Sequence, residues 1–182
     1  MVQFIEHSHL YNHDFSTASL AYLNRYPNPY AKHVKSSDTL EHCIDEDGRL
    51  RTTRLVVKTG RLPQFIKPFL GTSLDSWIIE KSVIDPKGKI LLSYTANVDH
   101  RKLLKVEEYL KYSCEDGINT LVESKVKFSS NFVGLKQKIE QWSHNRFLSN
   151  ISNSREGLKF VMNRLKERGG LWYRERDTSS LL

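Results

Sequence analysis

Apolar and polar residues alternate with the two-residue period of a β-strand in seven segments of the chain. The alternation is clearest near residue 125, where Val122, Val126 and Phe128 lie on one face and charged residues lie on the other. The segment Asp45-Glu46-Asp47-Gly48 and two later Asp/Gly-containing segments have the composition of hairpin turns. We therefore predict strands at 3–10, 33–44, 49–58, 74–84, 89–98, 105–114 and 120–128.

Two further segments have the period of a helix. The first runs from about 14 to 25, with Asp14 or Ser16 as its N-cap, and the second runs from 132 to about 168. A strand, a helix, six strands joined as a meander and a long helix predict an α+β fold, a curved antiparallel sheet of about seven strands. By analogy with known folds, a long C-terminal helix over such a sheet forms a helix-grip arrangement that encloses a lipid cavity.

The long helix carries polar residues along a line that begins as an apolar stripe. At 100° per residue the line runs through Leu135, Ile139, Trp142, Arg146, Asn150 and Asn153. Buried polar groups need partners, and an anionic ligand would supply one for the arginine. The alternative is a helix that leaves the sheet halfway, so that the stripe passes into solvent. The periodicity favours neither.

Residues 24–34 turn the chain between the first helix and the second strand. Pro27 and Pro29 prevent the helix from continuing and force an extended corner. Arg25 lies just before this corner and His33 just after it. Either Arg25 is a solvated residue of a rigid connector, or it lies at the edge of a cavity, where its planar guanidinium binds an anion.

Residues 60–71 form an apolar loop between two predicted strands. The loop is bounded by Gly60 and Gly71 and is longer than a tight hairpin needs. Its apolar side chains either form a lid that also contacts membranes, with Lys67 near lipid phosphates, or fold back into the core. The predicted lid residues are Leu62, Phe65, Ile66, Lys67, Phe69 and Leu70. Lys58 and Arg61 flank the start of the loop.

The 182-residue chain has a net charge of +7, and residues 131–182 carry ten Lys/Arg against five Asp/Glu. Nucleic acid, anionic lipid and acidic ligands all fit such a charge. Neither zinc-finger spacing nor an RNA-binding aromatic signature is present, so we expect no nucleic-acid partner. No apolar run is as long as a membrane span, and the N-terminus lacks the pattern of a secretory or transit peptide. Cys43 and Cys114 are too few for a disulfide framework.

The sequence gives little support for catalysis or metal binding. His7, His9 and His13 have metal-like spacing but no nearby carboxylate or thiolate partner, so we expect no metal. Asp99-His100 and Glu107-Glu108 contain groups suited to acid–base chemistry, but no nucleophile elbow or Gly-rich phosphate loop accompanies them. We therefore expect no catalytic residue and no cofactor.

Several long sequence blocks resemble the PRELI-domain family. They occur in the same order as in that family and extend from the N-terminus to about residue 168. The blocks are Asn24–Tyr30 with His33, Leu50–Leu55, Lys58–Leu70, Trp77–Glu80, Lys105–Tyr109, Val126–Ser130 and Glu140–Ser143. The resemblance is strongest to the fungal branch that carries phosphatidic acid. It implies a PRELI-type lipid-transfer domain at 1–170 followed by a tail at 171–182.

The resemblance also implies a function. Members of this branch carry phosphatidic acid from the outer to the inner mitochondrial membrane for cardiolipin synthesis. Their fold is similar to that of phosphatidylinositol transfer proteins, and phosphatidic acid is a bound cargo rather than a cofactor. They work in the intermembrane space, peripherally on the inner membrane, as a heterodimer with a small twin CX9C helical-hairpin protein. Two alternatives stay open, a phosphatidylserine carrier of the same family and a lipid-sensing scaffold that does not transfer lipid.

The family's head-group residues carry over to six positions of this chain. Four positions match, and at two positions an arginine replaces the usual lysine, which keeps the charge but changes the geometry. The matching residues are Arg25, His33, Lys58 and Asn150, and the replaced ones are Arg61 and Arg146. Asn153 departs further, because its position is basic in this branch of the family. The loop from Leu62 to Leu70 corresponds to the family's lid over the cavity.

Overall fold

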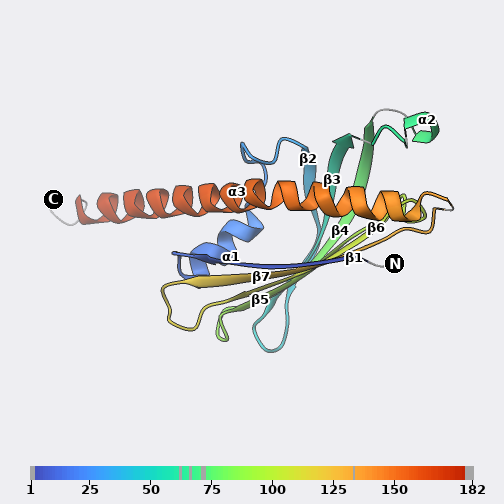
Figure 1. Cartoon of the computed structure of the whole chain (residues 1–182). Helices are drawn as coiled ribbons and strands as arrows, with labels where there is room; N and C mark the ends of the chain where they lie inside the picture. The colour runs from blue at the N-terminus through green and yellow to red at the C-terminus, as the bar shows by residue number, and fades with distance from the viewer. Residues whose placement is uncertain (1–2, 62, 66, 71–72, 133, 179–182) are drawn as a thin grey trace.

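Seven strands form one antiparallel sheet in the computed structural model of the chain (Figure 1). The structure describes residues 3–61, 63–65, 67–70, 73–132 and 134–178. For residues 61, 69, 70, 73 and 169–178 it describes only the backbone. The strands are β1 (Gln3–Tyr11), β2 (Val34–Ile44), β3 (Leu50–Arg61), β4 (Ser73–Asp85), β5 (Ile90–Asn97), β6 (Lys105–Ser113) and β7 (Thr120–Ser129). All seven predicted strands are therefore confirmed, with ends that shift by at most three residues.

The strand order is β1-β7-β6-β5-β4-β3-β2, so the last six strands form a meander and the first strand pairs with the last. The turns contain the residues that a tight reversal requires. Gly48 and Gly117 have φ of +79° and +77°, a region that residues with a side chain rarely adopt. Asp45 stabilises the first of these turns, because its Oδ1 accepts hydrogen bonds from the backbone N–H groups of Asp47 and Arg49.

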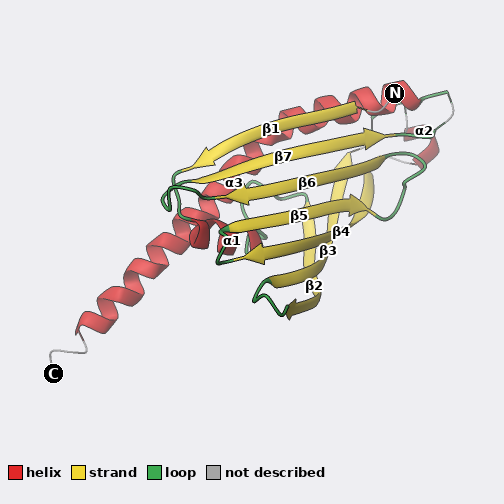
Figure 2. Cartoon of the chain, turned by 90° about the horizontal axis from the view of Figure 1, so that it is seen from below, coloured by secondary structure: helices red, strands yellow, loops and turns green. Residues whose placement is uncertain are grey.

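Two longer helices lie on one face of the sheet. Helix α1 (Phe15–Leu23) begins at its N-cap Asp14, whose Oδ1 accepts a 2.9 Å hydrogen bond from the backbone N–H of Thr17. Helix α3 (Lys136–Thr178) crosses the whole face, and its C-terminal part extends beyond the sheet (Figure 2). This arrangement is the predicted helix-grip fold, an α+β fold with a curved antiparallel sheet under a long helix.

The predicted bounds of the long helix were wrong at both ends. Gly134, with φ of +79°, cannot continue a right-handed helix, so α3 begins after it rather than at Phe132. At the other end the helix does not stop near residue 168 but continues past the glycines at 169 and 170 to Thr178. The structure also contains a short helix that was not predicted, α2 (Lys67–Leu70), inside the apolar loop.

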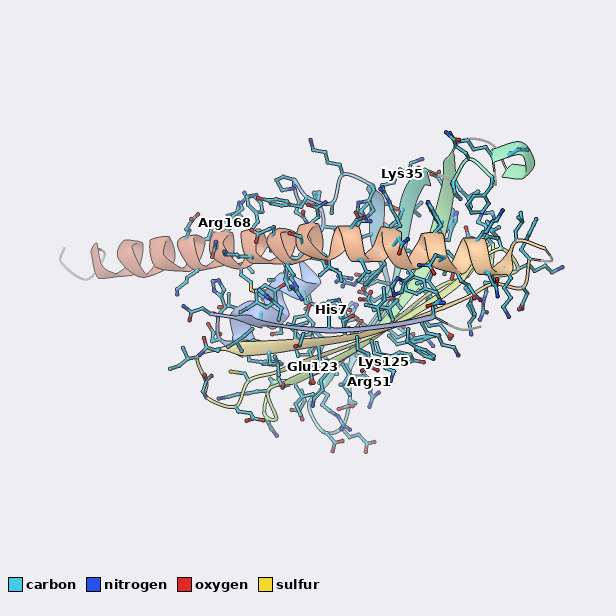
Figure 3. The ribbon with its side chains drawn as sticks, in the orientation of Figure 1. His7, Lys35, Arg51, Glu123, Lys125 and Arg168 are labelled. Carbon is cyan, nitrogen blue, oxygen red and sulfur yellow. The ribbon has the colours of Figure 1, made fainter. Side chains whose placement is uncertain are left out.

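The core consists of two apolar clusters between α3 and the sheet. The larger cluster joins α1, the second half of α3 and the adjacent strands, and includes Tyr22, Leu91, Tyr112 and Met162. The smaller cluster, around Val126 and Phe128, packs against the first half of α3. Charged side chains such as Arg51, Glu123 and Lys125 lie on the other face of the sheet, whereas His7 lies on the side of α3 (Figure 3).

Candidate functional site

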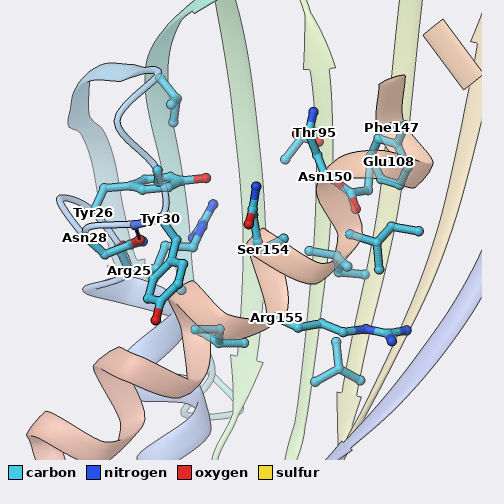
Figure 4. A pocket seen from close by; sticks show the side chains of 18 of the residues that line it. Arg25, Tyr26, Asn28, Tyr30, Thr95, Glu108, Phe147, Asn150, Ser154 and Arg155 are labelled. Atoms are coloured by element: carbon cyan, nitrogen blue, oxygen red, sulfur yellow. Dashed lines mark hydrogen bonds between the residues drawn. The ribbon is translucent and has the colours of Figure 1, made fainter. Parts of the chain in front are cut away.

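A cavity of about 290 Å³ lies between α3 and the sheet and is lined by residues of both core clusters. Figure 4 shows its walls: the corner after α1 on one side and α3 on another, over the inward face of the strands. The lining residues that carry charge are Arg25, Lys58, Glu80, Glu108 and Arg155, with His7, His9 and His33. Among the six predicted head-group residues, Arg25, His33, Lys58 and Asn150 line this cavity.

The corner (residues 24–34) is held in place by the side chain of Asn28. Its Nδ2 donates to the backbone oxygen of Arg25 at 2.6 Å, and its Oδ1 accepts from the backbone N–H of Tyr30 at 2.9 Å. The Tyr26–Pro27 peptide bond in this corner is cis. Gly157 of α3 gives the corner room, because a Cβ there would lie only 2.9 Å from Asn28 Oδ1. The corner can therefore pack directly on α3 and close one side of the cavity.

Arg25 forms a buried ion-pair cluster at the base of the corner. Arg25 and Arg54 both donate to the carboxylate of Glu80, whose side chain is only 1% exposed. Burial alone would raise the pKa of Glu80, but the charges of the two arginines lower the pKa below its ordinary value. Arg54 Nη1 also donates to the backbone oxygen of Leu23 at 2.6 Å, which fastens the end of α1 to the sheet.

The guanidinium of Arg25 is positioned by aromatic rings as well. Its Cζ lies 4.2 Å from the ring centre of Tyr22 and 4.8 Å from that of Tyr26. Arg25 Nη1 donates to the backbone oxygen of Tyr22 at 2.7 Å. Arg25 is therefore neither a solvated connector residue nor an unpaired cation. It is a paired cation at the cavity wall, and a guanidinium has five N–H donors in all.

Lys58 and His33 lie side by side because Lys58 of β3 pairs with Val34, the first residue of β2. The Nζ of Lys58 is 5.9 Å from the ring centre of Tyr26. Burial raises the pKa of the Tyr26 hydroxyl, but Lys58 and Arg25 outweigh burial and lower that pKa overall. Burial lowers the pKa of His33, and the charges of Lys58 and Arg146 lower it further. The positive charges of Lys58, Arg25 and Arg146 thus act on the side chains in this part of the cavity wall.

The polar line on α3 faces the cavity over part of its length. Asn150, Asn153 and Gly157 all contribute to the lining, so the helix does not leave the sheet at this point. Asn150 and Asn153 also keep contact with solvent, as residues at a cavity mouth do. Arg146 is exposed and does not line the cavity, although its charge acts on His33.

Four charged residues near the cavity were not predicted as site residues. Strand alternation could have identified Arg54, Glu80 and Glu108, because each lies on the same face of its strand as buried or cavity-lining neighbours. Arg155 lies about 200° around the helix from Asn153. It lines the cavity all the same, because the cavity extends to β1, where Arg155 Nη2 donates to the backbone oxygen of Ser8 at 2.9 Å.

The predicted lid is described only in part. Leu62 and Ile66 lie outside the described residues, and for Arg61, Phe69 and Leu70 only the backbone is described. Phe65 lines a shallow depression together with Gln3 and Trp142, which places this part of the loop near the start of α3. Lys67 is exposed. The lid function stays a prediction.

Within the ranges that the structure describes, no three His, Cys, Asp or Glu side chains are grouped so that they could hold a metal ion. His7 and His9 line the cavity, whereas His13 does not. Cys43 is exposed, Cys114 is buried, and both are free thiols. None of the described helices is both long and apolar enough to span a bilayer.

Comparison with solved structures supports the description of the fold. A Thermus thermophilus protein matches with a TM-score of 0.61 and 11% sequence identity, over 90% of this chain and 99% of that chain. The Zhui aromatase/cyclase of a Streptomyces species matches with a TM-score of 0.60 and 9% identity, over 90% of this chain and 95% of that chain. At such low identity these matches concern the fold alone.

Comparison with known sequences gives the family. Protein UPS1, mitochondrial, of Saccharomyces cerevisiae is 45% identical over 92% of this chain and 97% of its own length. The ups1 homolog of Schizosaccharomyces pombe is 44% identical over 83% of this chain and 90% of its own length. PRELI domain-containing protein 1, mitochondrial, of Gallus gallus is 32% identical over 80% of this chain and 70% of its own length. The sequence profile of the PRELI-like family matches residues 16–168, so this chain is a member of that family.

Proposed function

We propose that this protein carries phosphatidic acid from the outer to the inner mitochondrial membrane, where it feeds cardiolipin synthesis, and that it catalyses no reaction. The proposal rests on a cavity that is lined by cations of three separate segments, Arg25 of the corner, Lys58 of β3 and Arg155 of α3, in a chain of the PRELI-like family. The mitochondrial names of its relatives support the location. We place the protein in the intermembrane space, peripherally on the inner membrane.

The charges of the cavity suit a phosphomonoester. Such a group carries a charge of about −1.5 to −2 near neutral pH and offers several acceptor oxygens. Lys58 supplies a compact ammonium group, and Arg25 presents further N–H donors next to it. His33 adds a hydrogen-bonding group beside Lys58, and Asn150 adds one from the opposite side, on α3. Arg61 and Arg146 would attract the phosphate as it enters, which is the role that we assign to them.

The volume of the cavity suits a head group better than a whole lipid. Ligand pockets commonly measure about 300–1,000 Å³, and this cavity of about 290 Å³ lies at the lower limit of that range. Two acyl chains therefore require a wider cavity, and we propose that a movement of α3 or of the predicted lid loop opens it. We propose that this opening takes place at an anionic membrane surface, to which the excess of positive charge in residues 131–182 is attracted.

We also propose that the protein works as a heterodimer with a small twin CX9C helical-hairpin protein of the intermembrane space. This part of the proposal rests on membership of the family. Co-expression followed by gel filtration tests it. A stable complex of one copy of each chain is expected, and two separately eluting chains would contradict it.

Transfer between vesicles tests the function. Fluorescent phosphatidic acid, phosphatidylserine and phosphatidylcholine are placed in donor vesicles, and their appearance in acceptor vesicles is followed with the protein and its partner. We expect rapid transfer of phosphatidic acid and little of the other two, because only a phosphomonoester carries a charge near −2 to match the cations of the cavity. Equal or faster transfer of phosphatidylserine would instead fit the loss of a cation at Asn153. Stable binding without transfer would identify a lipid sensor.

A further inference from the structure

The inward face of the sheet carries two glutamates in a single row across the strands. Glu80 of β4 pairs with Thr95 of β5, and Thr95 pairs with Glu108 of β6. The row continues on one side to Arg54 of β3 and on the other to Val126 of β7. Neighbouring strands are about 4.8 Å apart, so the backbones of the two glutamates are separated by roughly 10 Å. Both glutamates line the cavity.

The two carboxylates have very different partners. Glu80 receives the guanidinium groups of Arg25 and Arg54. Glu108 receives the hydroxyl of Ser124, whose Oγ donates to its Oε1 at 3.0 Å. Lys58 acts on Glu108 only through space, without forming a hydrogen bond to it. Glu108 is therefore a carboxylate in the cavity wall whose negative charge is poorly compensated.

The surroundings of Glu108 include few charges that could compensate it. Burial raises its pKa, and the negative charge of Glu80 raises it further. Lys58, the Ser124 hydroxyl and Arg25 lower it, but the pKa stays above its ordinary value overall. The charged and titratable groups that line the cavity with Glu108 include His7 and His9 of β1, Arg25 and Tyr26 of the corner, His33, Lys58 of β3, Glu80 of β4, Tyr112 of β6 and Arg155 of α3.

We propose that Glu108 takes up one proton from solvent when an ionised phosphomonoester enters the cavity, and that its carboxylic acid group then donates a hydrogen bond to a phosphate oxygen. The proton returns to solvent when the ligand leaves. This inference rests on the proposed function, since it assumes that the anion binds beside Lys58 and Arg25. It makes Glu108 a binding residue for the head group, although its charge has the wrong sign for that role.

The physical reason is electrostatic. An ionised phosphate that binds Lys58 competes with Glu108 for that cation and adds negative charge to a partly buried site. Protonation removes the repulsion and converts an acceptor into a donor, which the phosphate can use. The bound protein therefore holds more protons than the free protein. Affinity is highest when Glu108 is already protonated, and it falls as the pH rises from the pKa of the free protein to that of the complex.

Isothermal titration calorimetry with short-chain phosphatidic acid tests the inference on the full chain. Wild type is compared with Glu108→Gln, whose side chain keeps the shape of glutamic acid and a hydrogen-bond donor but cannot ionise. The control is Glu107→Gln. Glu107 is the neighbour of Glu108 on the other face of β6, where it binds Lys105 Nζ at 2.8 Å. Titrations over a range of pH, in two buffers that differ in ionisation enthalpy, give the number of protons taken up.

We expect wild type and Glu107→Gln to take up more protons than Glu108→Gln. The ratio of the affinities of wild type and Glu108→Gln should fall by up to about tenfold per pH unit in that window. The titration of the ligand itself is common to all three proteins and cancels. Equal proton uptake and parallel pH profiles would overturn the inference and leave the proposed function standing. Absence of binding by wild type at every pH would overturn both.

Two further arms complete the experiment. Ser124→Ala keeps the carboxylate and removes its hydroxyl donor, so the pKa of Glu108 rises and the pH window should move upwards. An unchanged window would contradict the inference even if Glu108→Gln failed to fold. Glycerol 3-phosphate replaces the lipid in the last arm. Equal affinity for it would show that the site takes a free phosphomonoester rather than a lipid head group.

Discussion

At the scale of single residues, the stability of the fold and the position of Arg25 depend on the charge of Glu80. This carboxylate is almost completely buried and holds two arginines that come from different elements, Arg25 after α1 and Arg54 on β3. A buried ion pair adds little net stability compared with an apolar core, but removing one partner leaves an uncompensated charge inside the protein. Glu80 thus keeps Arg25 at the cavity wall and fastens α1 to the sheet.

We expect Glu80→Gln to lower the free energy of unfolding by about 3–5 kcal/mol, because two buried guanidinium groups lose their counter-charge. Urea denaturation followed by circular dichroism measures this loss. The control is Asp75→Asn, which breaks the exposed ion pair with Lys35 and should have little effect. A loss no larger than that of the control would show that Glu80 is dispensable.

The same variant has a defined pH dependence. The two arginines depress the folded-state pKa of Glu80, so its contribution is complete above the ordinary glutamate pKa of about 4.3 and is lost as the pH falls through the depressed value. The difference in stability between wild type and Glu80→Gln should therefore shrink in acid. A difference that stays constant down to the lowest accessible pH would mean that the pair contributes nothing through its charge.

Lys58 is the cation that we expect to matter most for binding. Its ammonium group lines the cavity and forms a charge-assisted hydrogen bond with the head group in our account. Such bonds contribute about 1.5–3 kcal/mol, so Lys58→Ala should weaken the binding of phosphatidic acid by about 10- to 100-fold. Lys35→Ala is the control, because Lys35 is exposed and does not line the cavity. Vesicle extraction of radiolabelled lipid gives both affinities, and equal values would exclude Lys58 from the site.

At the scale of elements, the contact between the corner and α3 shapes the cavity. Asn28 rests on Gly157, and the ring centres of Tyr30 and Phe160 are 6.4 Å apart. Both contacts join a segment near the N-terminus to the C-terminal helix, across the cavity. This contact keeps the cavity closed on one side and holds Arg25 and His33 opposite Asn150.

Gly157→Ala should therefore act differently in two backgrounds. In wild type the new Cβ meets Asn28, so we expect the corner to be displaced and the protein to be destabilised. In the Asn28→Ala background the clash is absent. The better helix propensity of alanine should therefore make the double variant about 0.5–1 kcal/mol more stable than Asn28→Ala alone. Thermal unfolding of the four proteins gives the coupling energy. Additive effects would show that Asn28 and Gly157 are not in contact.

The elements were predictable to different degrees for a physical reason. Strands, hairpin turns and the start of α1 depend on local patterns, which is why their bounds are close to those observed. The pairing of Glu80 with Arg25 and Arg54 depends on contacts between segments that are 26 or more residues apart, which no local pattern reveals. Four of the six predicted head-group positions line the cavity. The proline corner and the helix periodicity singled out Arg25 and Asn150 as candidates, whereas the assignment of all six positions to a head group came from the family resemblance.

At the scale of the whole molecule, charge should bring the protein to membranes. With a net charge of +7, we expect binding to vesicles that contain anionic lipid to weaken as salt is added. The screening length falls from about 30 Å at 0.01 M to about 10 Å at 0.1 M salt, so most of the loss should occur in this range. Vesicle flotation measures the bound fraction, and vesicles of neutral lipid are the control. Equal, salt-independent binding to both would show that charge does not recruit the protein.

The proposed function requires that the cavity under α3 holds the phosphate of phosphatidic acid. A crystal structure of the protein with a short-chain phosphatidic acid shows whether it does. We predict one lipid per chain, with a phosphate oxygen about 2.8 Å from the Nζ of Lys58, as in other charge-assisted hydrogen bonds. Asn150 and Arg25 should also contact the phosphate. A lipid that binds on the other face of the sheet, or a phosphate that contacts neither Lys58 nor Arg25, would contradict the account.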